Sequence, residues 1–364
     1  MKNRANIRKK KKIILNSEWY SLRSILGNDW AIWYFLLGGR EIGKSYATTD
    51  FFVRQWKTYG RPFYWLRLSE TSARKLLQNN AEKLIDPDLR RKYHLDLITN
   101  GDAVYEVVKS EIDEKTGKRK VIEKKLMARV LALATFYNDK GSGLFDKDFL
   151  NDPKMYYNIC LDEMNREKNE KKTFDIVYAF TNQLENLVRS TKQRVRVICI
   201  GNTLEEASDI LCAFNFIPQE FGRYKLKSKR AIIDYIAPSD AYLERRKGTI
   251  ADILMPDAST FTNIIRTDDS LVWTGRLMRP TAIVKFTSSK DNWFTIWDSN
   301  IVAKYNGEKS SRIISMRPYL DELFNTQIRD SVISLFDTRS LKYHNLITFK
   351  QFQKNLELLK PRTS

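Results

Sequence analysis

One glycine-containing pattern restricts the fold of this chain more than any other feature. The segment LLGGREIGKSY matches G-x-x-x-x-G-K-[ST] from Gly38 to Ser45. An apolar run at residues 30–37 comes directly before the pattern, and a stretch with a helical apolar face at residues 44–57 follows it. A strand, a glycine loop and a helix in this order predict a phosphate-binding loop.

Each residue type in the pattern has its own task in binding a nucleotide. Glycines let backbone N–H groups approach the phosphates, the Lys44 ammonium reaches the β- and γ-phosphates, and the Ser45 hydroxyl binds Mg²⁺. The predicted cofactors are therefore ATP and Mg²⁺. The residues predicted to bind ATP are the loop, the start of the helix and one later asparagine: Gly38, Gly39, Arg40, Glu41, Ile42, Gly43, Lys44, Ser45, Tyr46 and Asn202.

Two of these residues have alternative roles. Asn202 follows an apolar stretch at residues 193–200, where it is suited either to sensing the γ-phosphate and the attacking water or to forming a turn after Gly201. Arg40 lies inside the loop and contacts either a phosphate or a neighbouring subunit.

A second motif, Asp162-Glu163, directly follows the apolar run MYYNICL at residues 155–161. At the end of a strand, Asp162 is predicted to hold Mg²⁺ together with Ser45, and Glu163 is predicted to polarise the water that attacks the γ-phosphate. An ordinary surface pair of acids is the alternative, which the earlier phosphate-binding loop disfavours. The two motifs together predict an ATPase.

The chain between the motifs predicts further sheet structure. Residues 63–68 (FYWLRL) read as a strand, which completes a βαβ unit and predicts an α/β fold with a parallel sheet. We expect this additional strand to lie between the strand of the loop and the strand of Asp162. With the adjacent Glu163, it indicates the additional-strand, catalytic-glutamate class of P-loop ATPases. Residues 103–133 predict a basic hairpin, either a finger near nucleic acid or a solvated hairpin.

Stabilising the charge of a transferring phosphoryl group commonly requires an added cation. Arg189 follows the helical pattern at residues 173–187, and Lys140 lies in the segment NDKGSG at residues 138–143. Both are candidates for this catalytic role. An ordinary solvated cation is the alternative for each of them.

The overall charge favours a polyanionic partner. Lys and Arg total 63 against 44 Asp and Glu, which gives a formal net charge of +19. Neutralising phosphates with such cations releases condensed counterions, although positive charge also serves solubility. Residues 2–12 form a basic N-terminal arm. The three cysteines lack C-x-x-C spacing, and no apolar stretch reaches the length of a membrane span, so we expect no disulfide scaffold, no zinc site, no membrane and a cytosolic protein.

Composition shifts suggest three parts. Residues 1–237 are predicted to form the ATPase domain with its basic arm, residues 238–262 a linker and residues 263–364 a smaller α+β domain. The last part has strand patterns at residues 281–286, 293–298 and 312–316, followed by helical patterns around residues 319–335 and 349–359.

Three segments together carry a resemblance to a known family. The segments GGREIGKS, NICLDE and LVRSTKQRVRVICIGNT resemble the DNA-packaging ATPases of small podophages of the picovirinae type, which are compact relatives of terminase large subunits. The likeness runs from about residue 30 to residue 202 and more weakly through ERRK at residues 244–247. The Walker A and Walker B motifs are common to many ATPases, and the arginine-containing stretch is the more particular match.

The resemblance implies a motor that moves double-stranded viral DNA into a preformed procapsid. It further implies a pentameric ring that works with a portal and a packaging RNA, in the host cytoplasm and transiently at the portal vertex. Arg189 and Lys140 would then act on a neighbouring subunit. An apparent one-residue insertion near Arg189 leaves the choice among Arg189, Lys192 and Arg194 open.

In larger relatives the C-terminal domain is an RNase H-like nuclease, whose clustered carboxylates hold two metals. Here the candidate first strand presents Lys285, and Asp298 alone closes the next strand. We therefore expect a vestigial, non-cleaving domain that holds nucleic acid. Two rival functions remain: a hexameric helicase or cellular DNA-pump ATPase, and a weakly hydrolysing, nucleotide-dependent assembly scaffold.

Overall fold

The computed structural model shows a mixed α/β protein with one large, mostly parallel sheet and one smaller sheet. The chain divides into two compact units, the first made of Met1–Leu204 and Pro218–Ile265, the second of Glu205–Ile217 and Arg266–Ser364. The structure describes residues 19–28, 30–114, 117–134, 156–165, 174–188, 194–202, 208–218, 220–254, 271–322 and 324–359.

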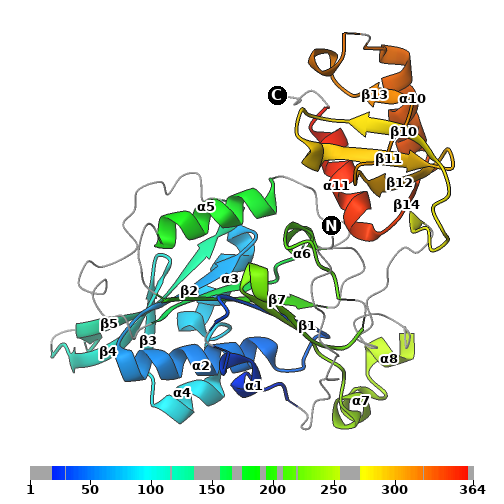
Figure 1. Cartoon of the computed structure of the whole chain (residues 1–364). Helices are drawn as coiled ribbons and strands as arrows, with labels where there is room; N and C mark the ends of the chain where they lie inside the picture. Colours follow the sequence, from blue (N-terminus) through cyan, green and yellow to red (C-terminus); the bar gives the residue numbers. More distant parts are fainter. Residues whose placement is uncertain are drawn as a thin grey trace. The chain divides into compact units, whose positions relative to one another are not determined.

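The first unit carries most of the named elements (Figure 1). In chain order they are α1 (Arg23–Leu26), β1 (Trp33–Gly38), α2 (Lys44–Tyr59), β2 (Phe63–Arg67), α3 (Glu70–Ala81), α4 (Pro87–Tyr93), β3 (Leu97–Asn100), β4 (Ala103–Ile112), β5 (Arg119–Ala132), β6 (Tyr156–Asp162), α5 (Ile176–Val188), β7 (Arg194–Asn202), β8 (Gly222–Leu226), β9 (Ala231–Tyr235), α7 (Asp240–Arg246) and α8 (Ile250–Leu254).

The large sheet has the strand order β3-β4-β5-β2-β6-β7-β1-β9-β8. The neighbours from β5 to β9 pair in parallel, whereas β3, β4 and β8 pair antiparallel at the two edges. Figure 1 shows α2 along one face of this sheet and α5 along the other. Helices on both faces explain why the central strands are apolar on both sides.

Alternate side chains of β1 pack against the helices on the two faces of the large sheet. Tyr34 and Leu36 belong to the apolar core that includes Phe52 of α2. Trp33 instead packs edge-on against Phe180 of α5, with 5.9 Å between ring centroids. Successive side chains of a strand point to opposite faces, so one short apolar run contributes to two helix-sheet interfaces.

The strand between the loop strand and the strand of Asp162 is not the expected one. In the sheet order, β7 lies between β1 and β6, and β2 pairs with the opposite edge of β6. The expectation that residues 63–68 would lie between them was therefore wrong. Both β2 and β7 are largely apolar, and apolar patterns do not specify which of two strands occupies a given position.

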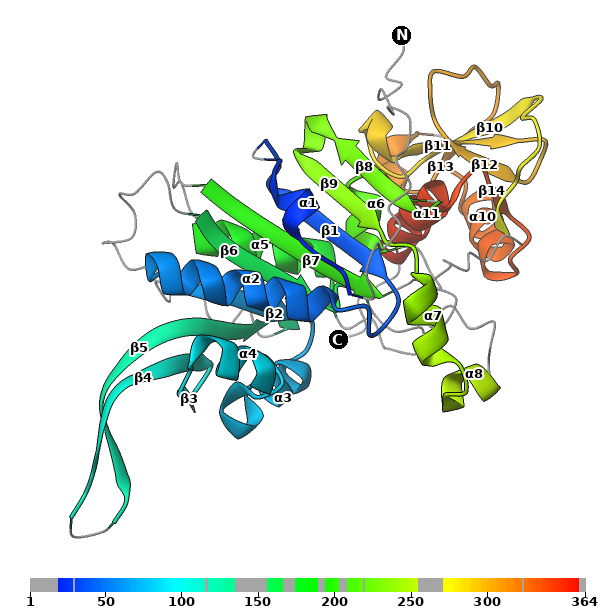
Figure 2. The same cartoon turned by 90° about the horizontal axis from the view of Figure 1, so that it is seen from below.

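The predicted hairpin at residues 103–133 is confirmed. Strands β4 and β5 pair antiparallel from Ala103↔Arg129 to Ile112↔Arg119, and Figure 2 shows their far end extending away from the rest of the unit. Its exposed part carries charges of both signs, because Glu111 and Glu123 lie among lysines and arginines. Strand β3, which pairs with β4, was not expected from the sequence.

The second unit contains α6 (Asp209–Ala213), β10 (Pro280–Lys285), β11 (Trp293–Trp297), β12 (Ile301–Lys304), β13 (Ile313–Ser315), α10 (Thr326–Asp337), β14 (Lys342–Tyr343) and α11 (Leu346–Glu357). Its sheet has the order β13-β10-β11-β12-β14, around an aromatic core that includes Phe286, Phe294 and Phe352. The three predicted strands and the last helix are confirmed, whereas β12 and β14 are too short to show a pattern. The other predicted helix begins only at Thr326, because Pro318–Leu320 forms a separate 3₁₀ turn.

The segment expected as a linker at residues 238–262 contains α7 and α8, and by its contacts it belongs to the first unit. Ser239 caps α7 by accepting a hydrogen bond from the Tyr242 N–H, as expected for a serine at this position. Among the described residues, no helix has the length and apolar character required to cross a membrane.

Candidate nucleotide-binding site

The predicted loop connects β1 to α2 and encloses the Lys44 side chain. The Lys44 ammonium donates hydrogen bonds to the carbonyl oxygens of Gly38 at 2.8 Å and Gly39 at 2.5 Å. Only 5% of Lys44 is exposed. The loop therefore holds a cation inside its own curve, which is the position that a phosphate-binding lysine requires.

The backbone of the loop depends on two left-handed residues. Gly43, at φ +86°, precedes the first residue of α2, and Glu41 has φ +63°. Glycine suits the first position, because a Cβ there would be strained and would lie 3.2 Å from the Trp19 ring. The first turn of α2 leaves backbone N–H groups without helical partners, and such a helix start attracts anions.

Strand order brings the second motif to the same place. Asp162 ends β6, and its Oδ1 lies 3.4 Å from the Ser45 hydroxyl, which donates to it. A hydroxyl and a carboxylate this close are the oxygen ligands that Mg²⁺ uses beside phosphates. The residues present therefore fit the predicted magnesium nucleotide.

The two acids of the motif differ in exposure. The side chain of Asp162 is 6% exposed and that of Glu163 is 57% exposed. The Glu163 N–H donates to Asp162 Oδ1 at 3.1 Å, and Glu163 itself has φ +56°. A left-handed residue that is not glycine is strained, and here it occurs where the second carboxylate is exposed to solvent.

Arg67 is a site residue that the sequence did not reveal. It ends β2, and its guanidinium forms ion pairs with both acids, with 2.8 Å to Asp162 and a closer contact to Glu163. The only signal in the sequence was an arginine near the end of the predicted strand at residues 63–68. Its role depends on β2 lying beside β6, which the pattern did not specify.

Burial shifts the protonation of the two central groups. Burial lowers the pKa of the Lys44 amine to about 7, Asp162 opposes this shift, and Arg40 adds to it. Burial also raises the pKa of Asp162, with Glu163 acting in the same direction and Arg67 and Lys44 opposing. The protein by itself therefore stabilises the charged forms of Lys44 and Asp162 only in part. A bound phosphate would stabilise the Lys44 ammonium, and a bound metal ion would stabilise the Asp162 carboxylate.

A cleft of about 1130 Å³ surrounds these groups. Its lining includes the predicted residues Arg40, Glu41, Ile42, Gly43, Lys44, Ser45, Tyr46, Asp162, Glu163 and Asn202. Trp19, Tyr20, Arg67 and Arg245 also line it and were not predicted. Gly38 and Gly39 contribute their carbonyl groups to Lys44 instead.

The candidate catalytic cations are not among the described residues that line this cleft. Arg189, Lys140 and Lys192 lie outside the described residues. Arg194 begins β7, paired with Tyr156 at the end of the sheet opposite to Asp162 and Asn202.

Solved structures of two packaging motors share this fold. A chain of the structure titled "The Phi-28 gp11 DNA packaging Motor" superposes with a TM-score of 0.60 at 14% identity, covering 95% of this chain and 99% of that one. A chain of "The bacteriophage Phi-29 viral genome packaging motor assembly" superposes with a TM-score of 0.57 at 18% identity, covering 94% of this chain and 100% of that one.

Sequence comparison also finds DNA packaging proteins among the relatives of this chain. The chain is 26% identical over 234 residues to the "DNA packaging protein" of Bacillus phage phi29, and to the same degree to that of Bacillus phage PZA. The alignment covers 64% of this chain and 60% of each relative, so it spans less than two thirds of their length. Residues 14–264, well over half of the chain, match the family described as "Podovirus DNA encapsidation protein (Gp16)". The chain therefore belongs to the podovirus DNA encapsidation protein (Gp16) family, in agreement with its resemblance to small-podophage packaging ATPases.

Proposed function

We propose that this protein hydrolyses ATP and uses the energy to move double-stranded DNA into a procapsid. The observation that carries the proposal is the approach of the Ser45 hydroxyl to within 3.4 Å of Asp162, next to the buried Lys44. A phosphate-binding loop and an acidic strand end that share one small space are the parts that phosphoryl-transfer enzymes require.

The residues have separate roles in binding. Lys44 leaves its two carbonyl partners and donates to the nucleotide phosphates, while the backbone N–H groups of the loop bind the same oxygens. Ser45 and Asp162 hold Mg²⁺, which when bound neutralises the charge that develops on the phosphates. Asn202, at the end of β7, lines the same cleft and would contact the terminal phosphate or its water.

Glu163 serves as the general base. Its exposed carboxylate faces the cleft, where it can accept a hydrogen bond from a water molecule. Its ion pair with Arg67 competes with this role, because a carboxylate bound to a guanidinium is a weaker acceptor for water. Glu163 would therefore be the stronger base after it has left Arg67.

The site is completed by a second subunit in this proposal. Arg189 and Lys140 supply cations across the interfaces of a homo-oligomeric ring, which we take to be pentameric. A cation supplied across an interface can accelerate phosphoryl transfer by about 10³- to 10⁵-fold. Each subunit then hydrolyses ATP efficiently only beside its neighbour.

The proposed partners are duplex DNA, the portal of the procapsid and a packaging RNA. The relatives named as DNA packaging proteins and the excess of 63 basic over 44 acidic residues support the choice of DNA. The protein would work in the host cytoplasm, transiently at the portal vertex.

The last domain, which we assign to residues 263–364, would hold nucleic acid without cleaving it. Asp298 accepts hydrogen bonds from the backbone N–H groups of Met278 and Arg279, at 3.1 Å each, so both of its carboxylate oxygens already have partners. Lys285 ends β10 and lies over the Trp293 ring at 4.5 Å. These contacts support a vestigial relative of the RNase H-like nucleases, and Mn²⁺-dependent DNA cleavage lost in Asp298→Ala would contradict it.

The test is ATP turnover measured against protein concentration, with and without duplex DNA. We expect specific activity to rise steeply with concentration and to increase further with DNA, because neighbours complete each site. Turnover that is proportional to concentration and indifferent to DNA would contradict the proposal. Strand separation of a forked duplex without any capsid would favour a helicase instead.

A further inference from the structure

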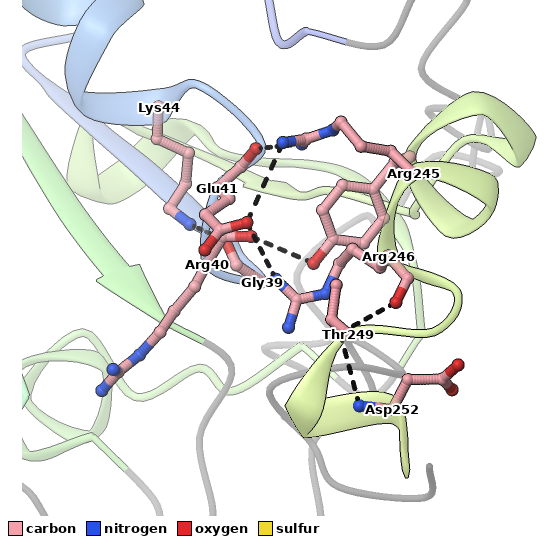
Figure 3. A network of polar contacts seen from close by, with 9 residues as sticks. Gly39, Arg40, Glu41, Lys44, Arg245, Arg246, Thr249 and Asp252 are labelled. Carbon is pink, nitrogen blue, oxygen red and sulfur yellow. Dashed lines mark hydrogen bonds and ion pairs between the residues drawn. The ribbon is translucent and has the colours of Figure 1, made fainter.

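Helix α7 contacts the phosphate-binding loop, although about 200 residues separate them in the sequence. The Tyr242 hydroxyl donates to the Arg40 carbonyl oxygen at 3.0 Å, and the Arg245 guanidinium donates to the Glu41 carbonyl oxygen at 2.8 Å. Arg246 forms an ion pair with the Glu41 carboxylate at 3.2 Å. Figure 3 shows the contacts of Arg245 and Arg246 converging on Glu41.

A third consecutive carbonyl of the loop is also bound from outside. The Ile42 carbonyl oxygen accepts a hydrogen bond from the Tyr20 N–H at 2.9 Å. In a trans peptide the N–H points opposite to the C=O of the same plane, and the described chain has no cis peptide bond. Binding the carbonyls of residues 40, 41 and 42 therefore directs the N–H groups of residues 41, 42 and 43 away from these donors.

Successive N–H groups that point to one side form an anion-binding concavity. That arrangement is strained here, because Glu41 has φ +63° and is not glycine. Such a conformation persists only where the surroundings impose it. The contacts from α7 are the surroundings that can do so, since both the carbonyl and the carboxylate of Glu41 are bound to it.

The helix that makes these contacts is itself firmly held. Tyr242 is fully buried and Arg246 is 7% exposed. After the helix, the Thr249 hydroxyl donates to the Arg246 carbonyl oxygen at 2.8 Å (Figure 3). The Gly248 N–H donates to the Asp252 carboxylate at 2.8 Å. A short helix fixed at both ends can impose a conformation on a loop, whereas a mobile one cannot.

We propose that α7 positions the phosphate-binding loop: Tyr242 and Arg245 hold the carbonyl groups of residues 40 and 41, and Arg246 holds the Glu41 carboxylate, so that the N–H groups of residues 41 and 42 face the nucleotide phosphates. These are positioning residues, which act on the nucleotide through the loop. The inference rests on the proposed function only in that the loop binds a nucleotide. By linkage, nucleotide binding must also stabilise the docked α7 to the degree that α7 favours binding.

Titration of ADP with Mg²⁺ into three purified full-length proteins tests the proposal. Tyr242→Phe removes one hydroxyl and keeps the buried ring, so we expect the dissociation constant of ADP to rise about five- to tenfold, as for one lost hydrogen bond. Arg246→Gln should raise it at least as much. Tyr343→Phe, which removes a buried hydroxyl without a hydrogen-bond partner in the second unit, is the matched control and should bind ADP like the wild type.

Two further measurements separate positioning from a merely structural role. In ATP turnover, Tyr242→Phe should raise KM more than it lowers kcat, because ground-state contacts to the phosphates are lost. A variant that is only partly folded would lower kcat at unchanged KM. In hydrogen exchange, the α7 amides of the wild type should gain protection with ADP, and this gain should shrink in Arg246→Gln.

Four outcomes decide the matter. Unchanged ADP affinity in a folded Tyr242→Phe protein would overturn the proposal, as would α7 exchange that ADP does not alter. A wild type that binds ADP but does not hydrolyse ATP would overturn the proposed function and leave the positioning role standing. A wild type that binds no ADP would overturn both. Should Arg246→Gln fail to fold, Tyr242→Phe still decides.

Discussion

The guanidinium of Arg67 lies 2.8 Å from a carboxylate oxygen of Asp162, at the ends of two neighbouring parallel strands. The same guanidinium contacts Glu163. One arginine therefore binds the residue that is proposed to hold Mg²⁺ and the residue that is proposed to activate water. This relationship makes Arg67 the first residue to test.

Replacing Arg67 by glutamine should destabilise the nucleotide-free protein. Two neighbouring acids would lose their shared cation, and the largely buried Asp162 would be left uncompensated, which costs about 2–4 kcal/mol. Urea unfolding measures the loss, and saturating Mg²⁺ and ADP should recover part of it. Arg129→Gln is the control, since its partner Asp102 is 41% exposed and such pairs contribute less than about 1 kcal/mol. Equal stability of the two variants would refute a special role for Arg67.

Replacing Glu163 by glutamine should abolish turnover but not binding. Loss of a general base lowers kcat by about 10²- to 10⁴-fold, while the amide keeps the size of the side chain. The ADP dissociation constant should stay within about twofold, because the contact with phosphate is made by the loop. Glu185→Gln on the exposed part of α5 serves as the control. Unaltered turnover in Glu163→Gln would instead support the assembly scaffold.

Replacing Ser45 by alanine should raise the Mg²⁺ concentration that turnover requires. One oxygen ligand beside Asp162 is removed, so the Mg²⁺ concentration for half-maximal turnover should rise about tenfold. Thr58→Ala removes an exposed hydroxyl near the end of the same helix and should change nothing. If Ser45→Ala and the wild type require the same Mg²⁺ concentration, the hydroxyl is not a ligand.

The buried triad of Tyr20, Asp234 and Arg223 predicts a pH-dependent stability. Tyr20 donates to Asp234 at 2.8 Å, and Arg223 forms an ion pair with the same fully buried carboxylate at 2.6 Å. Burial raises the pKa of Tyr20 well above its usual value, and the Asp234 charge acts in the same direction. The unfolded chain then loses this proton first as the pH rises past about 10.

The sign follows from proton binding. Above about pH 10 the unfolded state binds fewer protons, so the contribution of Tyr20 is fully present below that pH and falls by about 1.4 kcal/mol per pH unit above it. The stability difference between wild type and Tyr20→Phe, measured by urea unfolding, should therefore narrow between pH 9 and pH 11. A difference that is constant over this range would show that Tyr20 does not titrate differently in the two states.

Binding to duplex DNA should depend steeply on salt. If about five phosphates are neutralised, raising the salt from 50 to 200 mM should weaken binding about 10²- to 10³-fold. Fluorescence anisotropy with duplexes of two unrelated sequences measures this, and both should give the same slope because phosphates carry no sequence information. An affinity that does not change with salt would contradict the electrostatic basis of DNA binding.

Much of the site could be predicted because its chemistry is local. The loop from Gly38 to Ser45 and the Asp162-Glu163 pair are each contiguous, and glycine, lysine and strand-end acids have few other reasons to occur in this order. The hairpin at residues 103–133 could also be predicted, because the alternation of apolar and polar residues on both sides of a turn lies within one stretch of chain.

The remaining features depend on where distant segments meet. Sequence alone determined that the chain has a phosphate-binding loop and an acidic strand end; tertiary structure decided that β7 separates their strands, that Arg67 of β2 pairs with both acids, and that α7 supports Glu41. The apolar pattern of a strand is the same whichever neighbouring position it occupies in the sheet. An arginine is expected at the surface unless the acidic residue that it pairs with is known. Strand order therefore decides these roles, because it determines which side chains share one edge of the sheet.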